Sequence, residues 1–389
     1  MYRFIDETID ETIDEPISDK AAQSHVKTVT IAPPTPLPTH GAHPSPQPPL
    51  VLPLVETLCR RLAEKAIRYC HWKSNDMLAR SASGDNDLDL LVSRQDAERF
   101  TTLLHELGFK AAREIHPWQI PGILDYYGYD SESGRLVHAH VHYQLIVGED
   151  TTKNYHLPLE EPYLATATQG ALFKTPAPEF EFILFVIRMI LKHGTWDTML
   201  GGWGTLATGE RRELHYLEQQ VATSSLIALL NTHLPTVDYL FFTQCVAALA
   251  PDCPVWKRIA VGYQLQRRLR AHARRGHLRD VGLRFWRRGQ LAYRRRFAQL
   301  PKRQLCRGGA LIAIIGGDGS GKTTAVAKTY QWLSADFDTT KVHLGKPPWS
   351  RTTNTIRALL KVARRLTGTP YIEWAAVLYE GEKAVRGFA

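Results

Sequence analysis

A run of five apolar residues, 311–315, leads without a break into the eight residues Gly-Gly-Asp-Gly-Ser-Gly-Lys-Thr at 316–323, and this junction constrains the fold most. A continuous, isoleucine-rich apolar run is typical of a strand that is covered on both faces of a parallel sheet. The eight residues match the pattern Gly-x4-Gly-Lys-Thr, and apolar spacing then predicts a helix over 324–333. The sequence therefore predicts a strand, a phosphate-binding turn and a helix, in that order.

The residue types in this turn suit a bound nucleoside triphosphate. Glycines let successive backbone N–H groups point at phosphate oxygens, and the N-terminus of the following helix adds partial positive charge. Lys322 can reach the β- and γ-phosphates, and the hydroxyl group of Thr323 can bind Mg²⁺. We therefore expect ATP and Mg²⁺ as cofactors. The expected nucleotide-binding residues are Gly316, Gly317, Asp318, Gly319, Ser320, Gly321, Lys322, Thr323 and Thr324.

The inner part of the turn, 318–324, resembles the loop of thymidylate kinases, a P-loop family of mononucleotide kinases with a parallel five-stranded core. The resemblance implies transfer of the γ-phosphoryl group of Mg·ATP to a nucleoside monophosphate or a related acceptor. It implies catalytic roles for Lys322 and for Asp318, the carboxylate near the phosphates and the acceptor. Where the family has an Arg-Glu-Pro that holds the acceptor phosphate, this chain has Lys346 and Pro347, so the identity of the acceptor stays open.

The length of this last segment predicts an incomplete domain. From Ala310 onward the sequence has 80 residues, whereas five parallel strands with four crossovers need roughly 120 or more. Residues 371–385 resemble the helix that precedes the family's Asp-Arg-Tyr strand, but neither that strand nor the arginine-rich lid follows. We therefore expect that the chain binds ATP but transfers the phosphoryl group poorly.

A second candidate site is a pair of aspartates, Asp87 and Asp89, in the segment Gly84-Asp-Asn-Asp-Leu-Asp-Leu-Leu-Val92. Residues 88–92 are predicted to form a strand, on which both carboxylates project from one face while the leucines are buried on the other. Two such carboxylates can bind a divalent ion that bridges the phosphates of a nucleotide. The spacing alone also fits a polar turn that opens an edge strand, with both acids facing water.

The segment from His71-Trp-Lys-Ser-Asn75 through this pair to Leu145 resembles the nucleotidyltransferase superfamily. It also resembles an uncharacterised bacterial nucleotidyltransferase family that is sometimes fused to a thymidylate kinase-like domain. The resemblance implies catalytic and metal-binding roles for Asp87 and Asp89, and it places Lys73 near the nucleotide.

That superfamily takes a third carboxylate from a later strand, but this chain offers His138, His140 and His142 on one strand face. Imidazole nitrogen suits Zn²⁺ or Mn²⁺ better than Mg²⁺. Two interpretations stay open: the histidines contact a metal ion, or one of them holds the aspartate pair by hydrogen bonds and the others are solvated. Asp125 and Asp130 are weaker candidates for the third acid.

The net charge of +9 comes from one segment, 257–303, which has 16 Lys and Arg residues against one acid, Asp280. Apolar residues three and four apart predict a pair of amphipathic helices there. The charge indicates either simple solvation or contact with nucleic acid, an anionic membrane surface or an anionic acceptor, and no known nucleic-acid-binding motif accompanies it. The arginines expected on the outer faces are Arg267, Arg268, Arg274, Arg275, Arg287, Arg288 and Arg294–Arg296.

These patterns divide the chain into an acidic and proline-rich tail (1–50) that we expect to be disordered, and three further parts. They are a nucleotidyltransferase-like α/β domain (51–165), a helical region with the basic helices (166–305) and a truncated P-loop domain (306–389). In detail, we expect a strand over 136–146 and a helix that is capped by Thr175, starts at Pro176 and stops at Gly194. Scattered cysteines and the lack of a long apolar stretch favour a cytoplasmic protein without a transmembrane segment.

Three functional hypotheses stay open at this point. The leading one is an ATP-binding, thymidylate kinase-like protein with an appended nucleotidyltransferase-like module. The second is a nucleotidyltransferase that uses Asp87 and Asp89 and is regulated through the turn at 316–323. The third is a non-enzyme whose sites are remnants and whose basic helices bind an anionic partner. The acceptor and the oligomeric state stay open in all three.

Overall fold

The computed structural model describes residues 51–113, 120–196, 205–297, 302–306, 309–317 and 319–341, together with Thr355, Ala358, Val362 and Arg365. The predictions made for 1–50, for Asp318, for 345–347 and for 371–385 lie outside these residues. Within the described ranges, no helix combines the length and the hydropathy that a membrane crossing requires.

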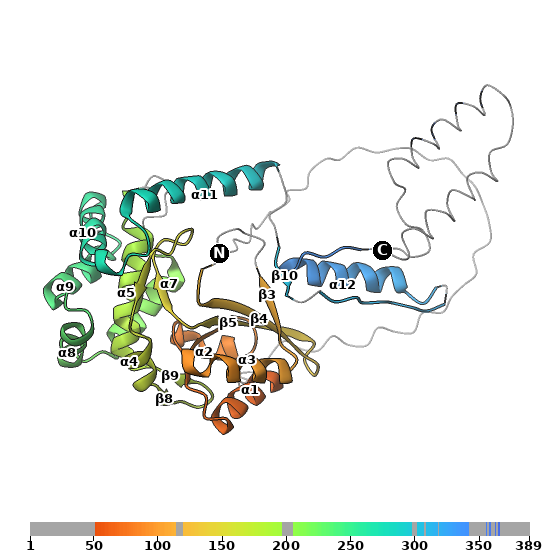
Figure 1. Ribbon diagram of the computed structural model, residues 1–389, viewed down its shortest axis with the longest axis horizontal. Coiled ribbons are helices and arrows are strands. Elements are labelled where there is room, and N and C mark those ends of the chain that lie inside the picture. Colours follow the sequence, from red (N-terminus) through yellow and green to blue (C-terminus); the bar gives the residue numbers. More distant parts are fainter. Residues whose placement is uncertain are drawn as a thin grey trace, which may run out of the picture. The chain divides into compact units, whose positions relative to one another are not determined.

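The centre of the described structure is a mixed sheet of six strands in the order β1-β2-β5-β4-β3-β10 (Figure 1). β2 and β5 are parallel, and the other neighbouring pairs are antiparallel. Two small hairpins, β6–β7 and β8–β9, accompany it. The strands are β1 (Tyr69–His71), β2 (Leu88–Val92), β3 (Lys110–Arg113), β4 (Ile123–Asp130), β5 (Arg135–His142), β6 (Leu145–Val147), β7 (Tyr155–Leu157), β8 (Thr168–Gln169), β9 (Lys174–Thr175) and β10 (Gln304–Leu305).

One face of the sheet packs against α1 (Pro53–Glu64) and α3 (Ala97–Glu106) (Figure 1). The residues that β2 and β5 contribute to this face are at most 1% exposed: Leu88, Leu90, Val92, Val137, Ala139 and Val141. Because successive side chains of a strand point to opposite faces, Asp89 and the three histidines of β5 must project from the other face. We call this second surface, with Asp89, Asp125, His138, His140 and His142, the polar face.

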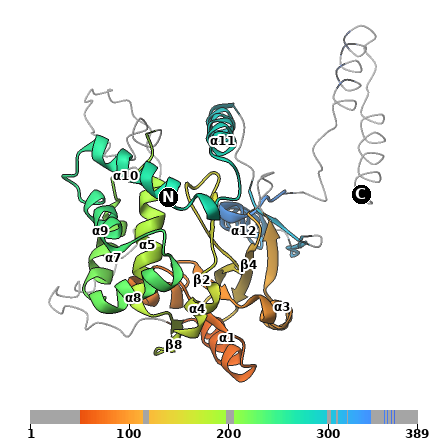
Figure 2. The ribbon, with the colours of Figure 1, turned by 60° about the vertical axis from the view of Figure 1, so that its left-hand side comes forward.

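The second core forms around α5 (Pro178–His193), which contacts α7, α8, α9 and α10 (Figure 2). α5 is buried almost all round, as expected for a helix with little polar surface. The remaining helices are α2 (Leu78–Ala82), α4 (Glu160–Ala165), α7 (Thr208–Glu218), α8 (Thr223–His233), α9 (Tyr239–Ala248), α10 (Val255–Arg268), α11 (His277–Phe297) and α12 (Lys322–Asp336), with 3-10 turns η1 (Asn75–Met77), η2 (Arg94–Asp96) and η3 (Arg270–His272).

The predicted α/β class is confirmed at this coarse level, and the strand at 88–92 is confirmed residue for residue. Two boundaries were predicted wrongly. α5 begins at Pro178 rather than Pro176, because Thr175 is paired with Thr168 in the β8–β9 hairpin. The strand predicted over 136–146 ends at His142, because residues 145–147 pair with β7 instead. Gly194 closes α5 as predicted.

The outward orientation predicted for the arginines of α11 is wrong for Arg287, whereas Arg295 and Arg296 are exposed as predicted. Arg284 and Arg287 are only 5% and 7% exposed, whereas the apolar Leu278 is 87% exposed. Arg284 forms an ion pair with Asp280 at 2.9 Å, and Arg287 donates to the backbone carbonyl of Thr151. Buried acceptors at these positions therefore outweigh the apolar periodicity of the helix. Contact of 257–303 with nucleic acid or another anionic surface stays a prediction.

The buried strand predicted at 311–315 is also wrong. These residues form no strand in the structure, and Leu311 and Ile315 are 96% and 91% exposed. A strand is stabilised by ladder hydrogen bonds and by cover on its faces, and no described segment pairs with this one. The parallel P-loop sheet that the sequence predicts is thus not formed by the described residues. The helix predicted at 324–333 is confirmed as α12.

Candidate functional site

The polar face lines up charged residues from three neighbouring strands. Asp89 of β2 lies opposite His140 of β5, and His140 lies opposite Asp125 of β4. The register therefore produces a row of carboxylate, imidazole and carboxylate across the sheet. Asp87 directly precedes β2 and is about half exposed, whereas Asp89 is 8% exposed.

Hydrogen bonds link this row into a network. The two ring nitrogens of His138 bond to Asp87 at 2.7 Å and to Asp125 at 2.8 Å. Nδ1 of His140 bonds to the same oxygen of Asp125 at 2.9 Å. The predicted alternative, in which one histidine holds the aspartate pair and the others are solvated, is met only in part: His138 holds Asp87 but not Asp89, and His142 is 1% exposed. Asp125, which the sequence offered as a weaker candidate, is the acid that the fold adds to the site.

The predicted nucleotide-binding Lys73 lies beside the second aspartate. Its Nζ is 2.8 Å from Oδ1 of Asp89, and both side chains are largely buried. Lys73 follows β1, and β1 pairs with β2, which carries Asp89. The pairing of these strands therefore brings Lys73 next to Asp89. Asp130, the other weak candidate, lies elsewhere: it accepts hydrogen bonds from the backbone of Leu54 and from Ser133 at a turn.

The pKa values follow from these contacts. Burial lowers the pKa of His138, but its hydrogen bonds to Asp125 and Asp87 outweigh burial and raise that pKa to about 9. The same bonds outweigh the burial of Asp125 and hold its carboxyl pKa well below the usual range. His138 is therefore a cation between two carboxylates at neutral pH. Burial, aided by His140, holds the pKa of His142 well below its ordinary value, so His142 is neutral.

Two groups on the polar face have the geometry to hold a metal ion. Ligand atoms of Asp89, His140 and His142 all lie within 4.8 Å of one another, and so do those of Asp125, His138 and His140. Asp87 belongs to neither group. Both ring nitrogens of His142 are buried without a hydrogen-bond partner, which is costly for a polar group unless a ligand satisfies it. One oxygen and two imidazole nitrogens fit Mn²⁺ or Zn²⁺ better than the Mg²⁺ expected from the aspartate pair.

The glycine-rich turn has part of the expected geometry. Gly319 and Gly321 adopt φ of +80° and +79°, a conformation that favours glycine, and α12 begins directly after them at Lys322. The ammonium group of Lys322 donates to the backbone carbonyl of Gly317, so the side chain folds back over the turn. Thr323 and Thr324 are exposed at the first turn of α12.

Comparisons with known proteins give no match: no family model fits the chain, and no curated protein or solved structure is significantly similar to it. The similarity to thymidylate kinases and nucleotidyltransferases thus stays a prediction from short motifs. The residues that sequence reasoning missed are Lys153, Arg188 and Lys192, which lie near the polar face. They are far apart in the sequence and match no motif, so only the fold could reveal them.

Proposed function

We propose that the polar face catalyses nucleotidyl transfer from a nucleoside triphosphate. The observation that carries this proposal is the row of Asp89, His140 and Asp125 across three strands, with Lys73 paired to Asp89. An acceptor hydroxyl oxygen attacks the α-phosphorus, the bond between that phosphorus and the oxygen bridging to the β-phosphate breaks, and pyrophosphate leaves. Asp87, the most exposed carboxylate of the site, takes the hydroxyl proton.

The other side chains bind and orient the nucleotide. Asp89, His140 and His142 would hold a divalent ion, which would neutralise charge on the phosphates when bound. The Lys73 ammonium group has three donors, of which one is paired with Asp89 and the others can reach phosphate oxygens, and it stands at the edge of the site. His138 keeps Asp87 and Asp125 in place by bonding to both. This arrangement favours nucleotidyl transfer over the polar-turn interpretation, in which the acids only face water.

The proposal is tested by release of pyrophosphate. The full chain is incubated with ATP, GTP, CTP or UTP labelled at the α-phosphate, in Mg²⁺, Mn²⁺ or Zn²⁺, with total RNA as acceptor and with the chain itself as the alternative acceptor. We expect metal-dependent release with at least one nucleotide, with Mn²⁺ more effective than Mg²⁺ because of the imidazole donors. Release no faster than in the protein-free blank, for all nucleotides and ions, would refute the proposal.

A second candidate function, favoured by the left-handed Gly319 and Gly321, is ATP binding at 316–323 for thymidylate kinase-like phosphoryl transfer. Backbone N–H groups of the turn and the first turn of α12 would face the phosphates, with Lys322 swung from Gly317 onto them and Thr323 binding Mg²⁺. The two candidates are compatible, since the residues involved are different.

Lys322→Ala should weaken binding of a non-hydrolysable ATP analogue at this turn about tenfold or more, because a charge-assisted contact to phosphate is lost. Isothermal titration in Mg²⁺ measures the affinity. Every protein compared also carries Asp89→Asn, so that the polar face does not bind the analogue. Lys328→Ala, an exposed lysine on the same helix, is the matched control. Equal affinities of Lys322→Ala and Lys328→Ala for the analogue would contradict ATP binding at 316–323. Unchanged pyrophosphate release by Lys322→Ala without Asp89→Asn would show that nucleotidyl transfer does not depend on this turn.

A further inference from the structure

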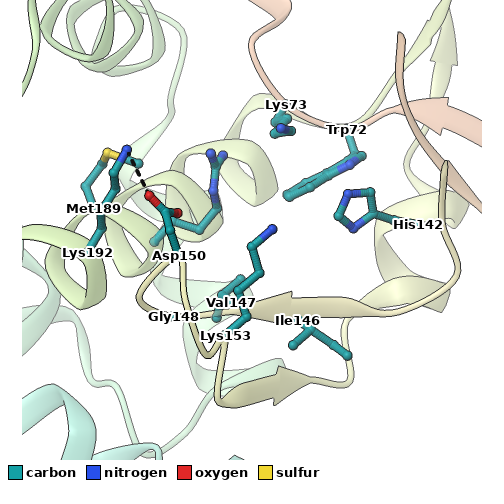
Figure 3. Close-up of a pocket in the computed structure, with 11 residues that line it drawn as sticks. Trp72, Lys73, His142, Ile146, Val147, Gly148, Asp150, Lys153, Met189 and Lys192 are labelled. Carbon is teal, nitrogen blue, oxygen red and sulfur yellow. Dashed lines mark ion pairs between the residues drawn. The ribbon is translucent and has the colours of Figure 1, made fainter. Parts of the chain in front are cut away.

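A pocket of about 240 Å³ lies beside the polar face and collects positive charge. Its walls come from the residues after β1, from the β6–β7 hairpin with its loop, and from α5, and His142 connects it to the polar face. Lys73, Lys153, Arg188 and Lys192 line it, against one acid, Asp150. We call it the cationic pocket. Figure 3 shows Lys153 rising from the loop into the space below Trp72 and Lys73.

Two of the four cations lack a direct ion-pair partner among the described residues. Lys73 is paired with Asp89, and Lys192 is paired with Glu210 at 3.0 Å and with Asp150 at 3.7 Å. By contrast, Lys153 and Arg188 are half-buried and form no hydrogen bond or ion pair with the residues that the structure describes. The Arg188 guanidinium only lies over the ring of Trp72, 5.3 Å from its centroid. Since partly buried charges without a direct partner are costly, an anion from outside the chain would stabilise these two cations.

The loop that carries Lys153 is held in a strained conformation. Lys153 has a φ of +39°, which a residue with a side chain rarely adopts. Arg274 donates to the carbonyl of Lys153 at 3.2 Å, and the side chain of Asn154 donates to the carbonyl of Arg275 at 3.0 Å. These contacts fix the backbone and keep the Lys153 ammonium group in the pocket. Strain of this kind persists where the surroundings enforce it, and it concentrates at ligand-binding sites.

The electrostatic consequence is visible at Lys153. Burial, reinforced by the nearby charge of Lys73, lowers its pKa to about 8. An anion placed among Lys73, Lys153 and Arg188 would offset this repulsion and raise the pKa of Lys153. Basic residues of 270–290 thus hold the loop that carries Lys153 and so position the Lys153 side chain in the pocket.

We propose that the cationic pocket binds a phosphate group, either of a phosphorylated small molecule or of the nucleotide. Several ammonium and guanidinium donors converging on one small volume match the charge and the acceptor oxygens of phosphate. The volume equals that of about eight water molecules at ~30 Å³ each, which accommodates a phosphate group with a short substituent. The inference does not depend on the proposed function, because inorganic phosphate alone can test it.

The test is isothermal titration of the full chain with inorganic phosphate, at constant ionic strength. Lys153→Gly should lower the phosphate affinity about tenfold or more, yet fold at least as well as the wild type, because glycine relieves the strain at φ +39°. Lys153→Arg should retain binding, and Lys110→Gln, an exposed lysine on β3 outside the pocket, should change nothing. No phosphate binding by the wild type, or unchanged binding by Lys153→Gly, would overturn the proposal.

Competition distinguishes the two sources of phosphate. If Mg·ATP or Mn·ATP displaces inorganic phosphate from the wild type but not from Asp89→Asn, the pocket holds phosphates of the nucleotide at the polar face. If phosphate and nucleotide bind together, the pocket holds a separate phosphate ester. Either result supports a phosphate-binding site in the cationic pocket. This conclusion remains valid even if the chain releases no pyrophosphate.

Discussion

Replacing Asp89 with asparagine is expected to reduce nucleotidyl transfer about 100-fold or more while the chain stays folded. The Asp89 carboxylate is buried, forms an ion pair with Lys73 and lies opposite His140 in the sheet. Asparagine keeps its shape but removes the charge that holds a divalent ion. Loss of metal-ion stabilisation costs several kcal/mol in the transition state, and each ~1.4 kcal/mol is tenfold in rate. The initial rate of pyrophosphate release at saturating nucleotide measures the effect.

Asp85→Asn is the matched control for this substitution. Asp85 lies two residues before Asp87, is half exposed, and bonds to Ser83 and Arg135 rather than to the polar face. Its replacement should leave the rate within about twofold of the wild type, because exposed ion pairs contribute little. Circular dichroism and the thermal midpoint should be similar for both variants. Equal activity of Asp89→Asn and Asp85→Asn would refute a role for Asp89 in the reaction.

The polar face could be predicted in part, because strand alternation follows directly from the sequence. The pattern of 88–92 and the His-x-His-x-His of β5 each predict one apolar and one polar face, and the structure has both. Which strands are neighbours does not follow from periodicity, so the role of Asp125 depended on the β4–β5 register. A hydrogen bond such as that between His138 and Asp125 is thus visible only once the sheet order is known.

The two largest errors have a common cause. Residues 311–315 and the apolar positions of α11 have a periodicity that is normally satisfied by burial, yet both are exposed in the structure. Periodicity predicts burial only where another element covers the apolar face. In α11, moreover, Asp280 pairs with Arg284, and Arg287 donates to the carbonyl of Thr151, so the buried face is polar. The cationic pocket escaped prediction for a similar reason, since its walls come from three separate elements.

The second large effect that we expect is a loss of stability where α5 and α10 approach closely, a contact that the sequence does not predict. Gly262 of α10 faces Gly194 at the end of α5, and a Cβ atom added at 262 would lie 2.0 Å from the carbonyl oxygen of Gly194. The obstacle is backbone, which cannot rotate away as a side chain can. Gly262→Ala should therefore lower the free energy of unfolding by about 3 kcal/mol or more, as measured by urea denaturation.

Gly282→Ala separates this clash from the intrinsic preference of helices for alanine. Gly282 lies in α11, where an added Cβ would meet no atom within 4 Å, so alanine there should stabilise the chain by up to about 1 kcal/mol. Destabilisation by Gly262→Ala beside a neutral or stabilising Gly282→Ala would show that α5 and α10 need the close contact. Because α5 carries Arg188 and Lys192, Gly262→Ala should also weaken phosphate binding. Equal stability of the two variants would mean that α10 can move away from Gly194 at little cost.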